Sequence, residues 1–405
     1  MRALFYCPKG AGHVNPTLPL VRGLVARGHD VTYTLTPEWR ERLEAMGCRY
    51  RNTGTPHDAP FTTANYNPGA PFYRQLLPTA AALLPRLVEE ARELGPDVVL
   101  FDSCAPWGYA ISEILGVPGI CSVSTLVFDR DEARREMGDP RERLDAKNVD
   151  ALETITRDWG VDFGDRDIGL FYGRENLVFS CEELNPTRAN VQGTFHFVGA
   201  CMDEKEHDLG DLAGYTKGRL RIYVSMGTVV GGNGGLDPTF FAPFVEAFGG
   251  REGIELLISA GAAASSFGAL PPNVTVRKSV PQTTVLAHTD VFVSHVGANS
   301  MHEALARKIP LVCVPHFGDQ PQNAARVVAE GAGVLVPRGE LSKERIAAEV
   351  ERVDSAPFRA NAARLADRLR VGGGLARALE VIESRARSRR IPDQRPIATE
   401  RASTS

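Results

Sequence analysis

The strongest constraint on the fold is that short apolar runs alternate with longer segments of helical period. In the first half of the chain, strand-like runs occupy residues 3–7, 31–35 and 97–101, and helix-like segments include residues 17–27 and 78–94. Strands that alternate with helices predict a parallel sheet covered by helices. The alternation begins again after residue 218, with strand-like runs at 221–225, 255–259, 291–294 and 311–315.

The length of the chain, 405 residues, indicates two domains, because one hydrophobic core rarely grows beyond about 250–300 residues. We therefore predict an α/β protein built from two Rossmann-like, doubly wound domains. The polar, turn-prone segment 202–217 is the predicted linker between domain 1–201 and domain 218–370. The charge-dense segment 129–168 lacks clear periodicity and is predicted to be an insertion. Residues 387–405 are predicted to be a disordered tail.

The charge balance favours small-molecule chemistry. The 46 basic residues nearly equal the 50 acidic residues, which gives no electrostatic reason to expect a nucleic-acid or membrane partner. The first strand-like run leaves no room for a signal peptide and no apolar run is long enough to span a bilayer, so we expect a cytoplasmic protein. The seven cysteines form no Cys-x-x-Cys pair and are interpreted as buried apolar side chains, with a disulfide framework or a zinc site as alternatives.

A glycine-rich turn after the first strand-like run carries a histidine. Residues 10–13 read Gly-Ala-Gly-His, and Asn15 occupies the place of the third glycine of a dinucleotide fingerprint. This difference argues against a dehydrogenase. It favours an imidazole, that of His13, at the carboxyl end of the sheet, where open α/β folds bind their ligands. The alternative is that His13 caps the helix that follows.

Asp102 follows the strand-like run 98–101 and is predicted to reach the same edge of the sheet as His13. A carboxylate there can accept a hydrogen bond from one ring nitrogen, fix the tautomer and stabilise the imidazolium that forms when the other nitrogen takes a proton. His13 and Asp102 would then form a general base. Helix N-capping is the alternative for Asp102.

Small and polar residues also follow strand-like runs in the second half of the chain. Ser225 and Thr228 begin a glycine-rich loop, which could bind an anion or be a plain turn. Residues 294–300, Ser-His-Val-Gly-Ala-Asn-Ser, precede a predicted helix with Glu303 in its first turn. Free N–H groups and the dipole at a helix N-terminus favour a diphosphate, and His295 can add a donor. Glu303 can equally be a capping residue.

Asp319 and Gln320 stand side by side after the strand-like run 311–315. A carboxylate accepts hydrogen bonds and a carboxamide both donates and accepts them, so the pair can bind vicinal sugar hydroxyls. Helix capping by Asp319 is the alternative.

Metal-binding motifs are not convincing. The Asp-x-Asp pairs at 129–131 and 165–167 follow no apolar strand that would hold them rigid, and His302-Glu303 lacks the second histidine of a zinc-binding helix. We therefore predict that no metal is required.

Together these motifs resemble those of family 1 glycosyltransferases of GT-B fold, in particular the bacterial macrolide and natural-product branch. GT-B enzymes have two Rossmann-like domains that face each other across a cleft. The Gly-Gly-Gly run at 372–374 and the helix after it resemble the last helix of the family, so residues 371–386 are expected to cross back onto the first domain. The motifs that carry the resemblance appear in the family's order: Gly-His-Val-Asn-Pro at 12–16, Asp102, Ser-x-Gly-Thr at 225–228, Val-Pro-Gln at 280–282, His-x-Gly-x-x-Ser at 295–300 and Asp-Gln at 319–320.

The resemblance implies a role for each motif. His13 would be the base that deprotonates an acceptor hydroxyl and Asp102 its partner, in a single displacement that inverts the anomeric centre without a metal or other cofactor. The residues implied in donor binding are Ser225, Thr228, His295, Gly297, Asn299 and Ser300 for the diphosphate, Val280 and Gln282 for the nucleobase, Glu303 for the ribose, and Asp319 and Gln320 for the sugar.

Substrates are implied only in outline. The donor is expected to be a hexose or deoxyhexose on UDP or TDP; Lys278 and Ser279 stand where many relatives place a Trp that stacks on the base, with Phe267 as a candidate replacement. The acceptor is expected to be a small polyketide, macrolide or aromatic natural product. Candidate residues of the acceptor pocket are Phe61, Tyr66, Phe72, Tyr73, Trp107 and Phe128.

Three other functions stay open at this point. A resistance or detoxification glucosyltransferase would use the same site. A nucleotide-sugar epimerase would need extra carboxylates facing the sugar, and these are not evident. A non-catalytic partner protein would have lost the diphosphate motif, which is complete here. We expect a monomer or a homodimer whose two domains close over the donor.

Overall fold

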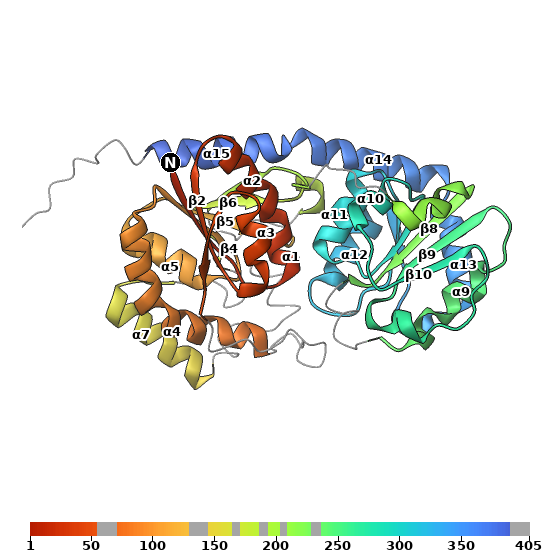
Figure 1. The fold of residues 1–405 in the computed structure, drawn as a ribbon, viewed down its shortest axis with the longest axis horizontal. Helices are drawn as coiled ribbons and strands as arrows, with labels where there is room; N and C mark the ends of the chain where they lie inside the picture. The colour runs from red at the N-terminus through yellow and green to blue at the C-terminus, as the bar shows by residue number, and fades with distance from the viewer. Residues whose placement is uncertain are drawn as a thin grey trace, which may run out of the picture.

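The computed structural model contains two α/β lobes, each built around one sheet (Figure 1). Every pair of neighbouring strands is parallel. The prediction of two doubly wound α/β domains is therefore confirmed. The structure describes residues 1–54, 71–128, 145–163, 171–185, 193–202, 209–227 and 236–388.

The first sheet has seven strands in the order β3-β2-β1-β4-β5-β6-β7. The order reverses between β1 and β4, which pair with Tyr6 opposite Phe101. Connections from two such strands leave on opposite faces and open a crevice at the carboxyl edge. His13 follows β1 and Asp102 ends β4, so both reach this crevice. The strands are β1 (Arg2–Tyr6), β2 (Asp30–Leu35), β3 (Arg49–Asn52), β4 (Val98–Asp102), β5 (Gly119–Val123), β6 (Glu175–Val178) and β7 (Thr194–Phe197).

Helices cover both faces of the first sheet. Along β1, Leu4 and Tyr6 enter one apolar cluster whereas Ala3 and Phe5 enter another, so the strand is buried on both sides. A strand buried in this way reads as a continuous apolar run, which is how it could be found in the sequence. The covering helices are α1 (Ala11–Val14), α2 (Leu18–Ala26), α3 (Arg40–Glu44), α4 (Pro71–Leu94), α5 (Pro106–Leu115) and α7 (Ala146–Trp159).

The second sheet has six strands in the order β10-β9-β8-β11-β12-β13 and reverses between β8 and β11, where Ser225 lies opposite Ser294. The loops with the diphosphate motif therefore start at the second crevice. Its strands are β8 (Leu220–Ser225), β9 (Ile254–Ser259), β10 (Val274–Arg277), β11 (Val291–Ser294), β12 (Leu311–Cys313) and β13 (Gly333–Leu335). Its helices are α9 (Ala242–Phe248), α10 (Gln282–Leu286), α11 (Ala298–Ala306), α12 (Gln320–Ala329), α13 (Lys343–Val353) and α14 (Ala356–Val371).

Two irregular segments of the sequence contain more structure than expected. Within 129–168, helix α7 starts where the Asp145 carboxylate accepts from the N–H of Asn148, and it buries Ile155. Within the predicted linker, residues 210–217 form a 3-10 helix whose Tyr215 is buried and hydrogen-bonds Thr289 of the second lobe. Apolar residues spaced too sparsely for a clear period therefore still anchor both segments.

The last helix, α15 (Gly374–Ser388), lies beside α2 of the first lobe (Figure 1). Gly23 of α2 permits the close approach, because a Cβ there would be 2.7 Å from Cδ1 of Leu379. Ion pairs from Glu383 to His29 and from Arg385 to Glu175 join the same helix to the lobe. The helix ends two residues beyond the predicted boundary at 386, and the rest of the predicted tail lies outside the described residues.

Candidate active site

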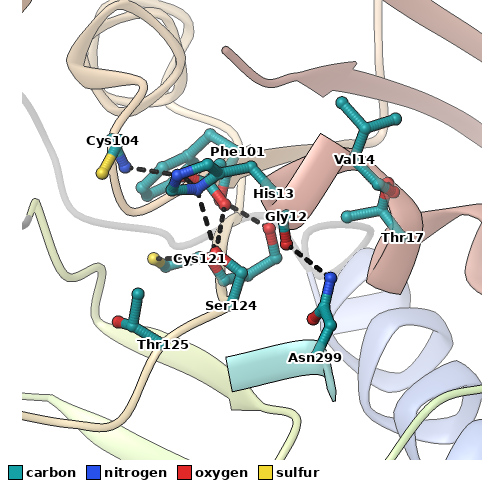
Figure 2. A network of polar contacts seen from close by, with 12 residues as sticks. Gly12, His13, Val14, Thr17, Phe101, Cys104, Cys121, Ser124, Thr125 and Asn299 are labelled. Carbon is teal, nitrogen blue, oxygen red and sulfur yellow. Dashed lines mark hydrogen bonds and ion pairs between the residues drawn. The ribbon is translucent and has the colours of Figure 1, made fainter. Parts of the chain in front are cut away.

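His13 and Asp102 form a hydrogen-bonded pair at the crevice of the first sheet (Figure 2). Nδ1 of His13 lies 2.9 Å from Oδ1 of Asp102, whose side chain is fully buried, whereas the imidazole keeps 18% of its surface exposed. The carboxylate accepts the proton of Nδ1, so Nε2 is left without a proton in the neutral ring. The ring is therefore arranged as an acceptor of a proton from outside.

The capping alternative for Asp102 is wrong. Helix α5 has Ala105 as its N-cap residue, and the Asp102 carboxylate instead accepts the N–H of Cys104 at 2.8 Å. This backbone hydrogen bond holds the carboxylate in the orientation that faces the imidazole. A carboxylate with several donors stays oriented when the ring beside it gains or loses a proton.

The pKa of His13 is set by opposing effects. Burial lowers it, but the charge and hydrogen bond of Asp102, with a further contribution from Asp319, raise it above the ordinary value for histidine. Asp319 belongs to the second lobe, so carboxylates of both lobes act on the imidazole. Burial raises the pKa of Asp319 itself, while Asn323 and His13 oppose that effect.

Ser124 is the third member of this group, and the sequence analysis did not predict it as a site residue. Its hydroxyl donates to Oδ2 of Asp102 at 3.1 Å, and its oxygen lies 3.0 Å from Nδ1 of His13 (Figure 2). Ser124 comes directly after β5, the neighbour of β4, and reaches the same edge of the sheet. That position is the only sequence signal that could have identified it.

In the second lobe, the loop before α11 has the form expected of an anion site. Gly297 is the N-cap residue and has no side chain with which to cap the helix, and the first N–H groups of α11 have no intrahelical partner. The ring of His295 packs between two glycines, because a Cβ on Gly227 or Gly297 would lie 2.5 Å from its Nε2. Burial, with the neighbouring His316, lowers the pKa of His295 to about 4. The ring of His295 is therefore neutral and brings no positive charge to the site.

Three residues predicted to bind the donor are joined by hydrogen bonds, and two of them lie on α11. Nε2 of Gln282 donates to Oγ of Ser300 at 3.0 Å and to Oε2 of Glu303 at 2.7 Å. The prediction that Glu303 lies in the first turn is wrong: α11 starts at Ala298, which places Glu303 in the second turn. Burial raises the pKa of Glu303, and the bond from Gln282 opposes this.

The Asp-Gln pair is held by the loop after β12. Oε1 of Gln320 accepts the N–H groups of His316 and Phe317, at 2.8 and 3.2 Å, and so fixes the loop backbone. Asp319 is the N-cap residue of α12 by position, but its carboxylate accepts from the side chain of Asn323 at 2.8 Å instead of capping the helix. The capping alternative for Asp319 is therefore wrong.

The remaining predicted residues are less informative. Ser225 accepts the N–H of Gly227 at 3.4 Å, and Val280 is partly buried against the core. Trp107 and Phe128 are buried in the apolar cluster of the first lobe, and Phe267 packs against Phe241 with ring centroids 6.1 Å apart. Thr228, Phe61 and Tyr66, and the side chains of Phe72 and Tyr73, lie outside the described residues.

The two lobes are in contact at the site. Nδ2 of Asn299, on α11, donates to the backbone oxygen of Gly12 at 3.0 Å (Figure 2). A residue predicted to bind the diphosphate thus contacts the loop that carries His13. The sequence places both residues beside glycine-rich loops but does not show that they meet.

Among the described residues, one group could approach a metal ion's ligand set: His13, Asp102 and Cys104, with ligand atoms within 4.8 Å of one another. Burial and the Asp102 charge raise the pKa of the Cys104 thiol well above its ordinary value. A protonated thiol is a poor ligand, because metals bind the thiolate. The seven cysteines are all buried and free, as interpreted from the sequence. Within the described part of the chain, every helix is too short or too polar to cross a bilayer.

Known proteins match both lobes. Residues 264–370 match the family model of UDP-glucoronosyl and UDP-glucosyl transferase, and residues 11–168 match a glycosyl transferase 4-like domain. The oleandomycin glycosyltransferase of Streptomyces antibioticus is 30% identical over 392 residues, which cover 92% of this chain and 88% of that protein. The demethyllactenocin mycarosyltransferase of Streptomyces fradiae is 29% identical over 407 residues, with 94% and 85% covered.

The fold of a solved structure is similar as well. The crystal structure of the glycotransferase of kitacinnamycin superposes with a TM-score of 0.80 at 28% identity, covering 95% of this chain and 98% of that one. Two facing parallel-sheet lobes with these motifs define an enzyme of the GT-B class that uses a nucleotide sugar. The chain belongs to the family of UDP-glucoronosyl and UDP-glucosyl transferases, together with the macrolide glycosyltransferases that it matches. The resemblance stated from the sequence is confirmed.

Proposed function

We propose that this enzyme transfers a hexose or deoxyhexose from UDP or TDP to a hydroxyl of a small polyketide, macrolide or aromatic natural product, with inversion at the anomeric carbon. The observation that carries the proposal is the His13–Asp102 pair, which leaves Nε2 of a partly exposed ring unprotonated while Asp319 of the second lobe acts on the same ring. Two of the relatives are named as transferases for the macrolides oleandomycin and demethyllactenocin, which supports the acceptor class.

The proposed step is a single displacement. Nε2 of His13 removes the proton of the acceptor hydroxyl, whose oxygen then bonds to the anomeric carbon from the face opposite the nucleotide. The bond between that carbon and the diphosphate oxygen breaks, and the diphosphate leaves with the electron pair. Asp102 stabilises the imidazolium that results, and the proton is later released to water.

The second lobe would hold the leaving group. The first N–H groups of α11 favour negative charge at this position, and preorganised donors cost no reorganisation during reaction. Gln282 and Glu303, which are hydrogen-bonded to each other, would present the base and ribose sites, and Ser300, which accepts from Gln282, would contact the diphosphate. Asp319 and Gln320 would contact the sugar.

The proposal is tested by mass spectrometry of the products. The wild-type protein and a His13→Ala variant each receive UDP-glucose or TDP-glucose and a panel of phenolic and macrolide acceptors, with and without a chelator. We expect a sugar-mass addition by the wild type that survives chelation and is absent in the variant, and an anomeric configuration opposite to that of the donor. Retention of configuration, or loss of activity with chelator that added Mg²⁺ restores, would contradict the mechanism.

A further inference from the structure

A second contact between the lobes is buried and takes no part in the proposed chemistry. His302 lies on α11 of the second lobe and is 5% exposed; its Nε2 is 2.8 Å from Oγ of Ser180, which follows β6 of the first lobe and is fully buried. Two polar side chains from different lobes thus meet out of contact with water. Each of these groups gives the other a hydrogen-bond partner, because a buried polar group without a partner is unfavourable.

The direction of every hydrogen bond in this contact can be assigned. Burial lowers the pKa of His302 to about 4, so the ring is neutral and has one proton. The backbone oxygen of Ala298 accepts that proton, and Nε2 is therefore the acceptor for the Ser180 hydroxyl. The oxygen of Ser180 accepts from Nδ2 of Asn185 at 3.0 Å.

Within the first lobe, the chain of hydrogen bonds continues from Ser180 through Asn185 to Val127. Oδ1 of Asn185 accepts the N–H of Val127 at 2.7 Å, and its Nδ2 also donates to the backbone oxygen of Cys181 at 2.8 Å. Each of these donors and acceptors has a partner. The chain therefore runs without a gap from the backbone of Val127 to the backbone of Ala298.

One end of this chain of hydrogen bonds lies near the proposed base, and the other lies at the proposed diphosphate site. Val127 belongs to the loop 124–128, whose Ser124 contacts both His13 and Asp102. Ala298 is the first residue of α11, where the diphosphate would bind. Another contact between α11 and the first lobe, Asn299 to Gly12, is exposed, and a diphosphate could compete for that amide. The buried contact has no such competitor.

We infer that His302 and Ser180 are positioning residues: their buried link sets the position of the donor-binding helix α11 relative to the loop 124–128, whose Ser124 contacts His13 and Asp102. The inference rests on the proposed function. A reacting hydroxyl and anomeric carbon must be held at near contact, and a displacement of about 1 Å costs on the order of 100-fold in rate. The link contacts neither substrate, so its effect should fall on the rate of transfer and not on the affinity for the nucleotide.

The experiment compares His302→Leu, Ser180→Ala and the double variant with Ser180→Thr, which keeps the hydroxyl. We expect each single loss to lower kcat roughly 10- to 100-fold, the double variant to match the worse single variant, and Ser180→Thr to stay within a few-fold of the wild type. The KM for the donor and the Kd for UDP or TDP should change less than about two-fold. Losses that multiply in the double variant, or a Kd that rises in step with the fall in kcat, would overturn the inference.

A second measurement does not depend on turnover. All seven native cysteines are buried, so cysteines placed at the exposed residues Glu41 and Glu252, one on each lobe, can be labelled selectively with a fluorescent donor and acceptor. We expect a wider distribution of distances between the labels in His302→Leu and Ser180→Ala, and an unchanged one in Ser180→Thr. An unchanged distribution in all variants refutes the link. A wild type that transfers no sugar refutes the proposed function, and the distance measurement still decides the link.

Discussion

Replacement of Asp102 by asparagine separates the charge of this residue from its hydrogen bonds. Oδ1 of Asp102 accepts both the N–H of Cys104 and the proton on Nδ1 of His13, whereas Oδ2 accepts from Ser124. The N–H of Cys104 needs an acceptor, so the amide oxygen of the introduced asparagine should take the Oδ1 position and the amide nitrogen should face Ser124. The tautomer of His13 is then preserved and only the negative charge is lost.

The magnitude follows from the contacts that remain. A hydrogen bond to a charged partner contributes roughly 1.5–3 kcal/mol and one between neutral groups about 1 kcal/mol. Loss of the charge should therefore weaken stabilisation of the imidazolium by about 1–2 kcal/mol, which is on the order of 5- to 30-fold in kcat/KM at high pH. Asp102→Leu also removes the acceptor and should lose on the order of 10³-fold or more.

The pH profile of kcat/KM is the decisive assay. His13 must be unprotonated to act, so activity rises with pH through its pKa, which Asp102 raises above 6.5. In Asp102→Asn burial still lowers the pKa but the principal opposing charge is gone, so the acid limb should move to lower pH. The deficit of the variant should then narrow as the pH falls toward 6. An acid limb that does not move, or a deficit that is the same at every pH, would refute the assignment of His13 and Asp102 as a coupled base.

Other predictions follow from the same contacts. Ser124→Ala removes a donor to Asp102 and should lower kcat about 5- to 10-fold, with Ser124→Thr near the wild type, as measured by steady-state kinetics. Gly297→Ala would place a methyl group 2.5 Å from Nε2 of His295 and should weaken UDP or TDP binding at least 10-fold by calorimetry, whereas Gly268→Ala, with nothing within 4 Å, should not; equal effects would contradict the packed-ring arrangement. Arg27 and His29 hold the pKa of Glu383 below its ordinary 4.5, so this group stabilises α15 above that pH and the contribution is lost as the pH falls through the lowered pKa. Glu383→Gln should therefore lower the free energy of unfolding by about 0.5–1 kcal/mol at pH 7 and by almost nothing at pH 3, measured by urea denaturation; a difference that persists at pH 3 would count against the ion pairs.

The His13–Asp102 pair could be predicted because the sheet topology alone brings these two residues close together. Neighbouring parallel strands end at one edge of a sheet, and residues that follow β1 and β4 meet there whatever the side-chain packing. Ser124 shares that edge, but a single serine after a strand has no distinguishing pattern. The position of Glu303 within α11 was misjudged because the N-cap residue of this helix is Gly297, which has no side chain to mark the cap.

The contacts between the lobes could not be predicted from the sequence. The bond from His302 to Ser180 joins residues 122 positions apart, and it depends on how two separately folded sheets come together. Nor does local patterning reveal the bond from Gln282 to Glu303, because it joins two different helices, α10 and α11, that lie on either side of β11 in the chain. Sequence periodicity reports burial along one element and carries no information about the angle between lobes.

The return of α15 to the first lobe has a consequence for synthesis of the chain. Leu379 and Ile382 belong to the same apolar cluster as Leu20 and Leu24, so the surface of α2 stays uncovered until the last described helix has been made. Domains generally fold in order as they leave the ribosome. Here the lobe made first is completed last, and a nascent chain that stalls anywhere in the second lobe exposes an apolar face on an otherwise finished first lobe.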